Sequence, residues 1–229
     1  RLSSMIQTRL RKPVLVDNDA SAMALGEFRY GAARGERNAI FLTLGTGIGG
    51  GLLIDGKLFH GELFSAAEIG HLHFGGRRLC GCGSRGCIET LLGNRYLLRT
   101  VRSDIRRGRA PRLKQWVRRS PAQKVTLEMI TQAAKRGDGY SKHFWAQAGD
   151  TLGQFLAGIC NLLNPSVIVI GGGVANAGKF IFGPLRISLK GHAFPMAGHF
   201  VRVLSARLGQ DAGIIGASCL ALERRRMRR

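Results

Sequence analysis

The chain has few acidic residues and few aromatic ones. Its 229 residues include 14 Asp and Glu against 35 Lys and Arg, and aromatic side chains make up 7%. No apolar run approaches the roughly 18 residues of a membrane span, and no charged-then-apolar segment of the secretory type opens the sequence. We therefore expect a soluble, cytoplasmic protein with no membrane partner. With 45% hydrophobic residues the composition is globular, which excludes global disorder.

The positive charge, formally +21, would suggest nucleic acid or another anionic partner if it were spread over the chain. Instead, ten basic residues and one acid, Asp104, lie between Arg95 and Arg119, and five more arginines lie between Arg224 and Arg229. Aromatic residues that could stack on bases are scarce in the first stretch. We interpret that stretch as a solvated helical face and do not expect a nucleic-acid partner.

Cysteine is also scarce, and the odd number of five argues against a disulfide framework. Three of the five form the pattern Cys80-x-Cys82-x4-Cys87, which places soft metal ligands on one tight loop. Either His71 or His73 can add a nitrogen ligand and complete a Cys3His set. Four protein ligands leave no open position, so the pattern predicts a structural zinc site.

The order of the expected elements indicates an α/β fold. Strands are predicted at Ala39–Leu44, Gly51–Ile54, Lys57–Phe59, Val167–Ile170 and Val201–Leu204, and Val14–Val16 resembles a short buried strand. Helices are predicted at Ala20–Tyr30, Ile88–Gly108, Thr126–Arg136, Ser141–Leu163 and Ala212–Leu222, with a loop or short helix at Ala110–Pro121. Gly213 and Gly216 would let the last helix pack closely. Cys160 and Cys219 have apolar neighbours and are predicted to lie in the core.

Two glycine-rich segments follow predicted strands: the run from Gly45 to Gly51 after Leu44, and Gly171 to Gly173 after Ile170. Consecutive amides without side chains can wrap phosphate oxygens, and ligands approach open α/β sheets at the carboxyl ends of strands. The first segment matches neither a Walker loop nor a dinucleotide fingerprint, and each of the two could be a plain turn. Together they favour a nucleotide that lies between two lobes.

Three acids stand close to these motifs: Asp19 at a strand-to-helix junction, Glu68 before the histidines, and Glu89 after the cysteine cluster. Carboxylates in such places can bind the hydroxyl groups of a polyol. Each of them could equally be a solvated or capping carboxylate. Asp17 in particular could cap the helix that follows it.

Five segments in one order resemble the ROK family (repressor, open reading frame, kinase), and within it the glucokinase-like sugar kinases. They are VDNDASA (Val16–Ala22), LTLGTGIGGGLLIDGKL (Leu42–Leu58), AAEIGHLHF (Ala66–Phe74), CGCGSRGCIE (Cys80–Glu89) and NPSVIVIGGGV (Asn164–Val174). The resemblance implies an actin-like ATPase, hexokinase-type fold (ribonuclease H-like) with ATP and sugar between two α/β lobes. Residues 1–38 would then be the remainder of the N-terminal lobe. Residues 39–210 would form the C-terminal lobe with a zinc loop at about 71–87, and residues 211–229 a final helix and basic tail that returns to the N-terminal lobe.

The resemblance also implies roles for single residues. Asp19 matches the catalytic base that takes the proton of the sugar hydroxyl. The matched sugar ligands are Asn18, Glu68, His71 and Glu89. His71, rather than His73, holds the family's Glu-x-Gly-His position and would coordinate zinc with Cys80, Cys82 and Cys87. The matched ATP-binding positions are Gly45, Thr46, Gly47 and Gly49 in one phosphate loop and Gly171, Gly172 and Gly173 in the adenosine-side loop.

The implied activity is phosphorylation of a hexose or N-acetylhexosamine by ATP and Mg²⁺, with a structural Zn²⁺, in a homodimer. The family's first phosphate motif, Asp-x-Gly-Gly-Thr, has no counterpart in a chain that begins at Arg1. We therefore expect an N-terminally truncated chain with an incomplete first lobe. The alternative function is that of a sugar-responsive transcriptional regulator whose DNA-binding part lies upstream of residue 1. Because the Asn18-Asp19 pair and the first glycine loop are intact, the sequence favours the kinase.

Overall fold

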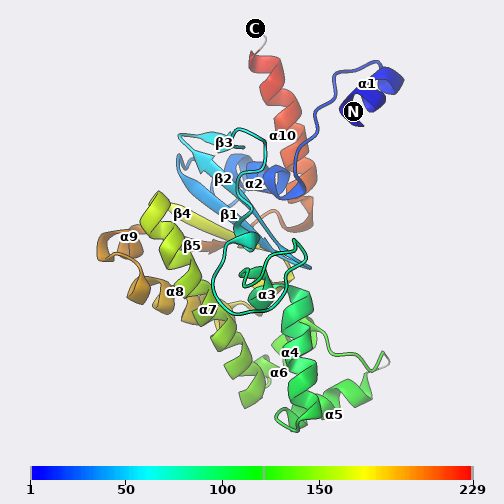
Figure 1. Cartoon of the computed structure of the whole chain (residues 1–229), viewed down its shortest axis with the longest axis vertical. Helices are drawn as coiled ribbons and strands as arrows, with labels where there is room; N and C mark the ends of the chain where they lie inside the picture. The colour runs from blue at the N-terminus through cyan, green and yellow to red at the C-terminus, as the bar shows by residue number, and fades with distance from the viewer. Residues whose placement is uncertain (1, 121, 228–229) are drawn as a thin grey trace.

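A five-stranded mixed sheet with the strand order β3-β2-β1-β4-β5 forms the centre of the protein (Figure 1). The structure, a computed structural model, describes residues 2–120 and 122–227, of which residues 224–227 are described by their backbone alone. The strands are β1 (Ala39–Leu44), β2 (Ile48–Ile54), β3 (Lys57–Phe59), β4 (Val167–Gly171) and β5 (Arg202–Ser205). The pairs β1–β2 and β2–β3 are antiparallel, whereas β1–β4 and β4–β5 are parallel.

The helices are α1 (Leu2–Leu10), α2 (Asp19–Tyr30), α3 (Glu89–Leu92), α4 (Asn94–Arg106), α5 (Pro111–Arg119), α6 (Leu127–Lys135), α7 (Gly139–Leu163), α8 (Lys179–His192), α9 (Pro195–Phe200) and α10 (Ala212–Met227). Three 3₁₀ turns are η1 (Ile69–His71), η2 (Gly173–Ala177) and η3 (Gly209–Asp211). Side chains accept backbone N–H groups at the start of two of the predicted helices, Thr126 at α6 and Asp138 at α7. No helix among the described residues combines the length and the apolar character needed to cross a membrane.

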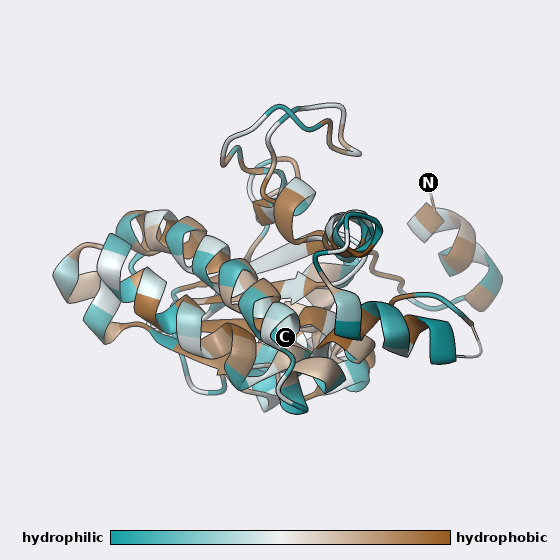
Figure 2. Ribbon diagram, turned by 90° about the horizontal axis from the view of Figure 1, so that it is seen from below, coloured by the Kyte–Doolittle hydropathy of each residue, from teal (hydrophilic) through white to brown (hydrophobic). Residues whose placement is uncertain are grey.

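The two faces of the sheet are covered by different helices, which gives three layers. In β1, Ile40 and Leu42 belong to the core that includes α7 and α8, whereas Ala39 and Phe41 pack with α2. This alternation follows from the period of two along a strand. Figure 2 shows apolar and polar residues interspersed along the helices, whose apolar side chains supply much of the core.

Helices α2 and α10 lie side by side on one face of the sheet, although they are far apart in the sequence (Figure 1). Their contact depends on glycine: a Cβ atom on Gly216 would collide with the carbonyl oxygen of Ala22, and one on Gly26 would lie 2.5 Å from the carbonyl oxygen of Ala212. The predicted close packing is thus confirmed for Gly216. It is not needed at Gly213, where a Cβ would meet only Met23, at 3.8 Å.

A buried carboxylate joins α2 to the segment between β5 and α10. Glu27 is 0% exposed. Its Oε1 accepts the backbone N–H groups of Arg207 at 2.9 Å and Leu208 at 2.7 Å, and its Oε2 accepts that of Ala32 at 2.7 Å. Three backbone donors thereby replace the water that an exposed carboxylate would bind.

Several predicted boundaries are wrong. Val14–Val16 forms no strand, and Val16 is 55% exposed, because no described strand lies beside it to supply hydrogen bonds. The predicted helix Ile88–Gly108 is divided at Gly93, whose extended backbone (ψ 141°) separates α3 from α4. Strand β2 begins at Ile48 instead of Gly51, because Gly49 and Gly50 continue the ladder opposite Thr43 and Leu42.

Candidate active site

Both predicted glycine loops emerge from the same edge of the sheet. Strands β1 and β4 run parallel, with Thr43 opposite Gly171, so the residues that follow each strand lie next to one another. Gly172 has a φ of 84°, and a Cβ there would collide with the backbone of Leu44. The second loop can therefore pack directly on the end of β1 only with glycine at this position.

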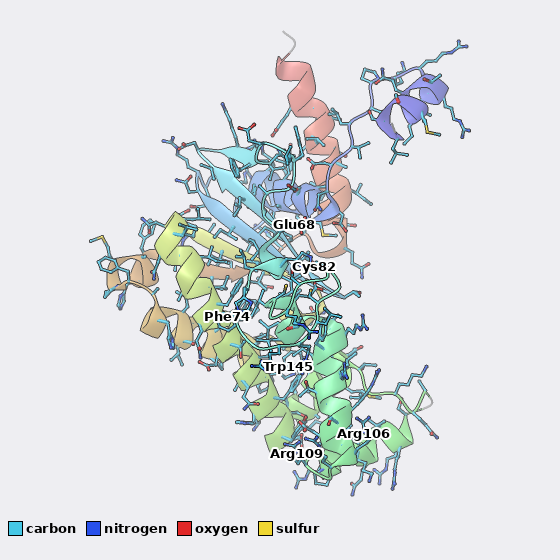
Figure 3. All side chains as sticks on the ribbon, viewed as in Figure 1. Glu68, Phe74, Cys82, Arg106, Arg109 and Trp145 are labelled. Atoms are coloured by element: carbon cyan, nitrogen blue, oxygen red, sulfur yellow. The ribbon has the colours of Figure 1, made fainter. Side chains whose placement is uncertain are left out.

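A cavity of about 390 Å³ lies beside the first glycine loop. It brings together most of the predicted site residues: Asn18, Asp19, Gly45, Thr46, Gly47, Gly49, Glu68 and Glu89. Ala20, Met23, Thr43, Ile48, Gly50, Ala66 and Ala67 complete the lining. His71 and the loop from Gly171 to Gly173 do not line this cavity. Figure 3 labels Glu68 and Cys82 in the middle of the molecule, between the sheet and the helices α4 to α6.

The N-terminus of α2 carries the pair Asn18-Asp19. Asn18 is the N-cap residue, and its Oδ1 accepts the backbone N–H groups of Ala20 at 2.8 Å and Ser21 at 3.2 Å. The suggestion that Asp17 caps this helix is therefore wrong. The Asp19 side chain stands at the first position of the helix and lines the cavity, where its carboxylate can accept a proton from a bound hydroxyl group.

The first glycine loop is shorter than the sequence suggests, since only residues 45–47 lie between β1 and β2. Its glycines also allow close packing. A Cβ on Gly47 would collide with the carboxylate of Glu89, and one on Gly49 would lie 2.7 Å from the Cβ of Ala20. A Cβ on Gly45 would meet nothing within 4 Å, so the opening of the loop faces free space.

Glu89, the first residue of α3, links the glycine loop to the cysteine loop. Its Oε2 accepts the backbone N–H of Ile48 at 2.8 Å, and its Oε1 lies 3.7 Å from Sγ of Cys80. The sequence predicts a sugar ligand at this position but not this link between two loops. The bond from Ile48 holds this carboxylate at the cavity wall.

The predicted zinc ligands His71, Cys80, Cys82 and Cys87 lie together, with their donor atoms within 4.8 Å of one another. Nδ1 of His71 is 3.6 Å from Sγ of Cys80, and the Sγ atoms of Cys82 and Cys87 are 3.7 Å apart. A tetrahedral zinc with Zn–S bonds of about 2.3 Å and a Zn–N bond of about 2.0 Å separates its ligand atoms by roughly 3.5–3.8 Å. The four side chains therefore fit a closed zinc site.

His73, the alternative ligand, lies outside this cluster, and its Nδ1 is 3.1 Å from the carbonyl oxygen of Arg85. Nε2 of His71 lies 4.0 Å from a carboxylate oxygen of Glu68, so the ring connects the cluster to the cavity. A hydrogen bond from the backbone at Ser84 lowers the pKa of Cys82 to about 7, whereas burial raises the pKa of Cys87 to about 12.

The other two cysteines lie in the core, as predicted, and burial raises the pKa of Cys160 to about 11. The basic stretch lies on α4 and α5, and Figure 3 shows Arg106 and Arg109 at the end of the molecule farthest from the sheet. Its one acid, Asp104, accepts a hydrogen bond from Tyr140 at 2.8 Å and pairs with Arg109 at 3.0 Å. The arginine-rich tail from residue 224 lies outside the described side chains.

The sheet, its two glycine loops and the carboxylate-lined cavity define a protein of the actin-like ATPase fold, of the hexokinase type. The chain belongs to the ROK family, whose family model matches residues 1–224. It is 36% identical to a glucokinase of Streptomyces coelicolor over 230 aligned residues, covering 97% of this chain and 71% of the relative. It is 29% identical to a xylose repressor of Caldicellulosiruptor bescii, covering 96% of this chain and 54% of the repressor.

Comparison with a solved structure also places the chain beside a ROK family glucokinase. The chain matches a ROK family glucokinase from Streptomyces griseus, crystallised with glucose and AMPPNP, with a TM-score of 0.82 and 36% identity, over 96% of this chain and 71% of that one. The chain thus spans about 70% of the length of its glucokinase relatives. Both kinases and repressors are among its relatives, so family membership alone does not decide the activity.

Proposed function

We propose that the protein phosphorylates a hexose or N-acetylhexosamine with ATP. The observation that carries this proposal is the single cavity in which Asp19 and Glu68 lie beside the glycine loop from Gly45 to Gly47. Phosphoryl transfer needs an oriented nucleophile, charge neutralisation and little covalent chemistry from the protein. The carboxylate can orient the nucleophilic hydroxyl group, and the neighbouring loop of backbone amides can neutralise charge on the phosphates.

In the proposed reaction, Asn18, Glu68 and Glu89, which line the cavity, bind and orient the sugar hydroxyl groups, and His71 stands behind Glu68, with its Nε2 4.0 Å from that carboxylate. Asp19 accepts the proton of the attacking hydroxyl, whose oxygen bonds to the γ-phosphorus of ATP while ADP leaves. The amides of Thr46 and Gly47, with the hydroxyl of Thr46, bind phosphate oxygens, whereas the N–H of Gly45 closes the loop on the carbonyl oxygen of Gly47 at 2.9 Å. Gly171 to Gly173 lie toward the adenosine. ATP enters as its magnesium complex.

Zinc, held by His71 and the three cysteines, supplies no chemistry to this reaction because its four protein ligands leave no free position. The ion would fix the loop that carries His71 and, through Cys87, the start of α3 with Glu89. Preordered hydroxyl acceptors then meet the sugar without a further loss of side-chain freedom.

A sugar-responsive regulator is the second candidate, favoured by the repressor relatives. Titration calorimetry with glucose, N-acetylglucosamine and N-acetylmannosamine, followed by an ADP-release assay with ATP and magnesium, separates the two. A kinase binds one of these sugars and releases ADP, and Asp19→Asn abolishes the release while it keeps the sugar affinity. Asp55→Asn, in the exposed β2–β3 turn, is the matched control. Sugar binding without ADP release would refute the kinase function and favour the regulator function. The absence of sugar binding would refute both candidate functions.

A further inference from the structure

The segment that leads into Asn18 and Asp19 has little support of its own. Residues 11–18 form no strand or helix, and Val16 is 55% exposed. Val14 is hydrogen-bonded to α1, through Ser3 at 3.0 Å and Gln7 at 3.4 Å. Helix α1 has no buried residue and so offers no rigid surface. Some other contact must hold the approach to α2 against the sheet.

Asp17 makes that contact. Its Oδ2 lies 2.8 Å from Nε2 of His60, which directly follows β3, and its Oδ1 accepts the backbone N–H of Asn18 at 2.8 Å. The side chains of Asp17 and His60 are 11% and 22% exposed. Such partial burial strengthens a hydrogen bond relative to a fully solvated pair such as Arg37–Asp55, at 78% and 71%.

His60 in turn holds the loop that leads to a second segment of the cavity lining. Its carbonyl oxygen accepts the backbone N–H of Ala66 at 2.9 Å and so closes the loop of residues 60–66. Its ring lies 5.1 Å from the ring of Phe64 in the same loop. That loop continues directly into Ala67 and Glu68, which line the same cavity as Asn18 and Asp19.

We infer that Asp17 and His60 are positioning residues that set the distance between two segments of the cavity lining, Asn18 with Asp19 and Ala67 with Glu68. Neither residue lines the cavity, so neither needs to touch the sugar. The inference rests on the proposed function, since it takes Asn18, Asp19 and Glu68 as the groups that meet the hexose. The glycine loop is held separately, by the pairing of β1 with β2 and by Glu89, and should not respond to this pair.

The test measures hexose and ATP dissociation constants by calorimetry for Asp17→Ala, His60→Ala and the double variant. Each single variant should raise the dissociation constant for the hexose roughly tenfold, which corresponds to a loss of about 1.4 kcal/mol of binding free energy. The double variant should be no weaker than either single one, because both remove the same hydrogen bond. The ATP constant should stay unchanged. Asp17→Glu, which restores a carboxylate, should recover part of the hexose affinity, and Asp17→Asn and His60→Gln replace any alanine variant that does not fold.

Arg37→Ala and Asp55→Ala remove an ion pair of similar length and serve as controls with unchanged hexose binding. If the wild type binds hexose, and the hexose dissociation constants of the Asp17 and His60 variants stay within about twofold of the wild-type value, the positioning role is refuted and the proposed function stands. An equal loss of hexose and ATP affinity would show a general structural role and would also refute the inference. A wild type that binds no hexose would instead refute the proposed function.

Discussion

Replacing Glu27 by alanine should lower the stability of the protein more than almost any other change to a charged residue. The carboxylate is fully buried and accepts three backbone N–H groups. Alanine would leave all three donors, which are partly buried, without this partner. Because α2 carries Asp19 at its other end, the same change would loosen the helix that supports the candidate site.

The magnitude follows from the three hydrogen bonds. A hydrogen bond to a charged group contributes about 1.5–3 kcal/mol, and bonds that share one acceptor are not additive, so we expect a loss of roughly 3–5 kcal/mol. For a chain of this size each kcal/mol lowers the melting temperature by about 2–4 °C, which gives a decrease of roughly 10 °C. Glu27→Gln keeps one acceptor oxygen and turns an amide N–H₂ group toward a donor, so it should cost about half as much.

Thermal unfolding followed by circular dichroism, with urea unfolding as a second measure, tests this expectation. Glu128→Ala, an exposed acid in the first turn of α6, is the matched control and should change the unfolding free energy by less than about 1 kcal/mol. A Glu27→Ala protein that melts within about 2 °C of the wild type would refute the reasoning, because the loss of three hydrogen bonds to one buried carboxylate should lower the melting temperature by more than that.

Three further predictions concern the metal, the helix contact and the backbone. The purified protein should contain about one zinc ion per chain by elemental analysis, since four ligands complete the ion's coordination. The Cys82→Ser variant should lose the zinc, and the control Cys160→Ser should keep it. A zinc-free wild-type protein would contradict the proposed metal site. Gly216→Ala should lower the unfolding free energy by about 2–3 kcal/mol, because the added Cβ clashes with α2. Gly158→Ala, with open space around the added Cβ, should raise the unfolding free energy by roughly 0.5–1 kcal/mol. If urea unfolding gave the same change in free energy for both variants, the close packing of α2 and α10 would be contradicted. Ala67 has a φ of 67°, so Ala67→Gly should relieve strain and raise stability by about 0.5 kcal/mol after glycine's entropy in the unfolded state; a lower melting temperature would contradict this.

The parts of the fold that could be predicted from the sequence are those that depend on local patterns. Residues 39–44 form a strand because their apolar side chains pack on both faces of the sheet, and residues 139–163 form a helix because apolar residues recur at three- and four-residue steps. The metal ligands could be found for a similar reason, since three of the four lie within one short loop. Local pattern could not show that Gly93 divides a helical stretch, because a single glycine is tolerated in many helices.

The remaining features depend on contacts between distant segments. Glu27 looks like a solvated acid in a helix, and only the segment around Arg207 and Leu208 makes it a buried acceptor. His60 carries no motif, and its contact with Asp17 appears only when β3 is placed beside the approach to α2. The error at Val14–Val16 has the same origin, because an apolar run becomes a strand only where a neighbouring strand can pair with it.

The glycine contact between α2 and α10 has a consequence for synthesis. The helix that begins with Asp19 is among the first parts of the described chain to leave the ribosome, and the helix it packs against is the last. At translation rates of about 5–20 residues per second, α2 waits many seconds with its apolar face uncovered. The nascent protein should therefore present that face to chaperones until α10 has emerged, and a ribosome stalled before α10 should hold a chain in which α2, and the candidate site at its start, still lacks this support.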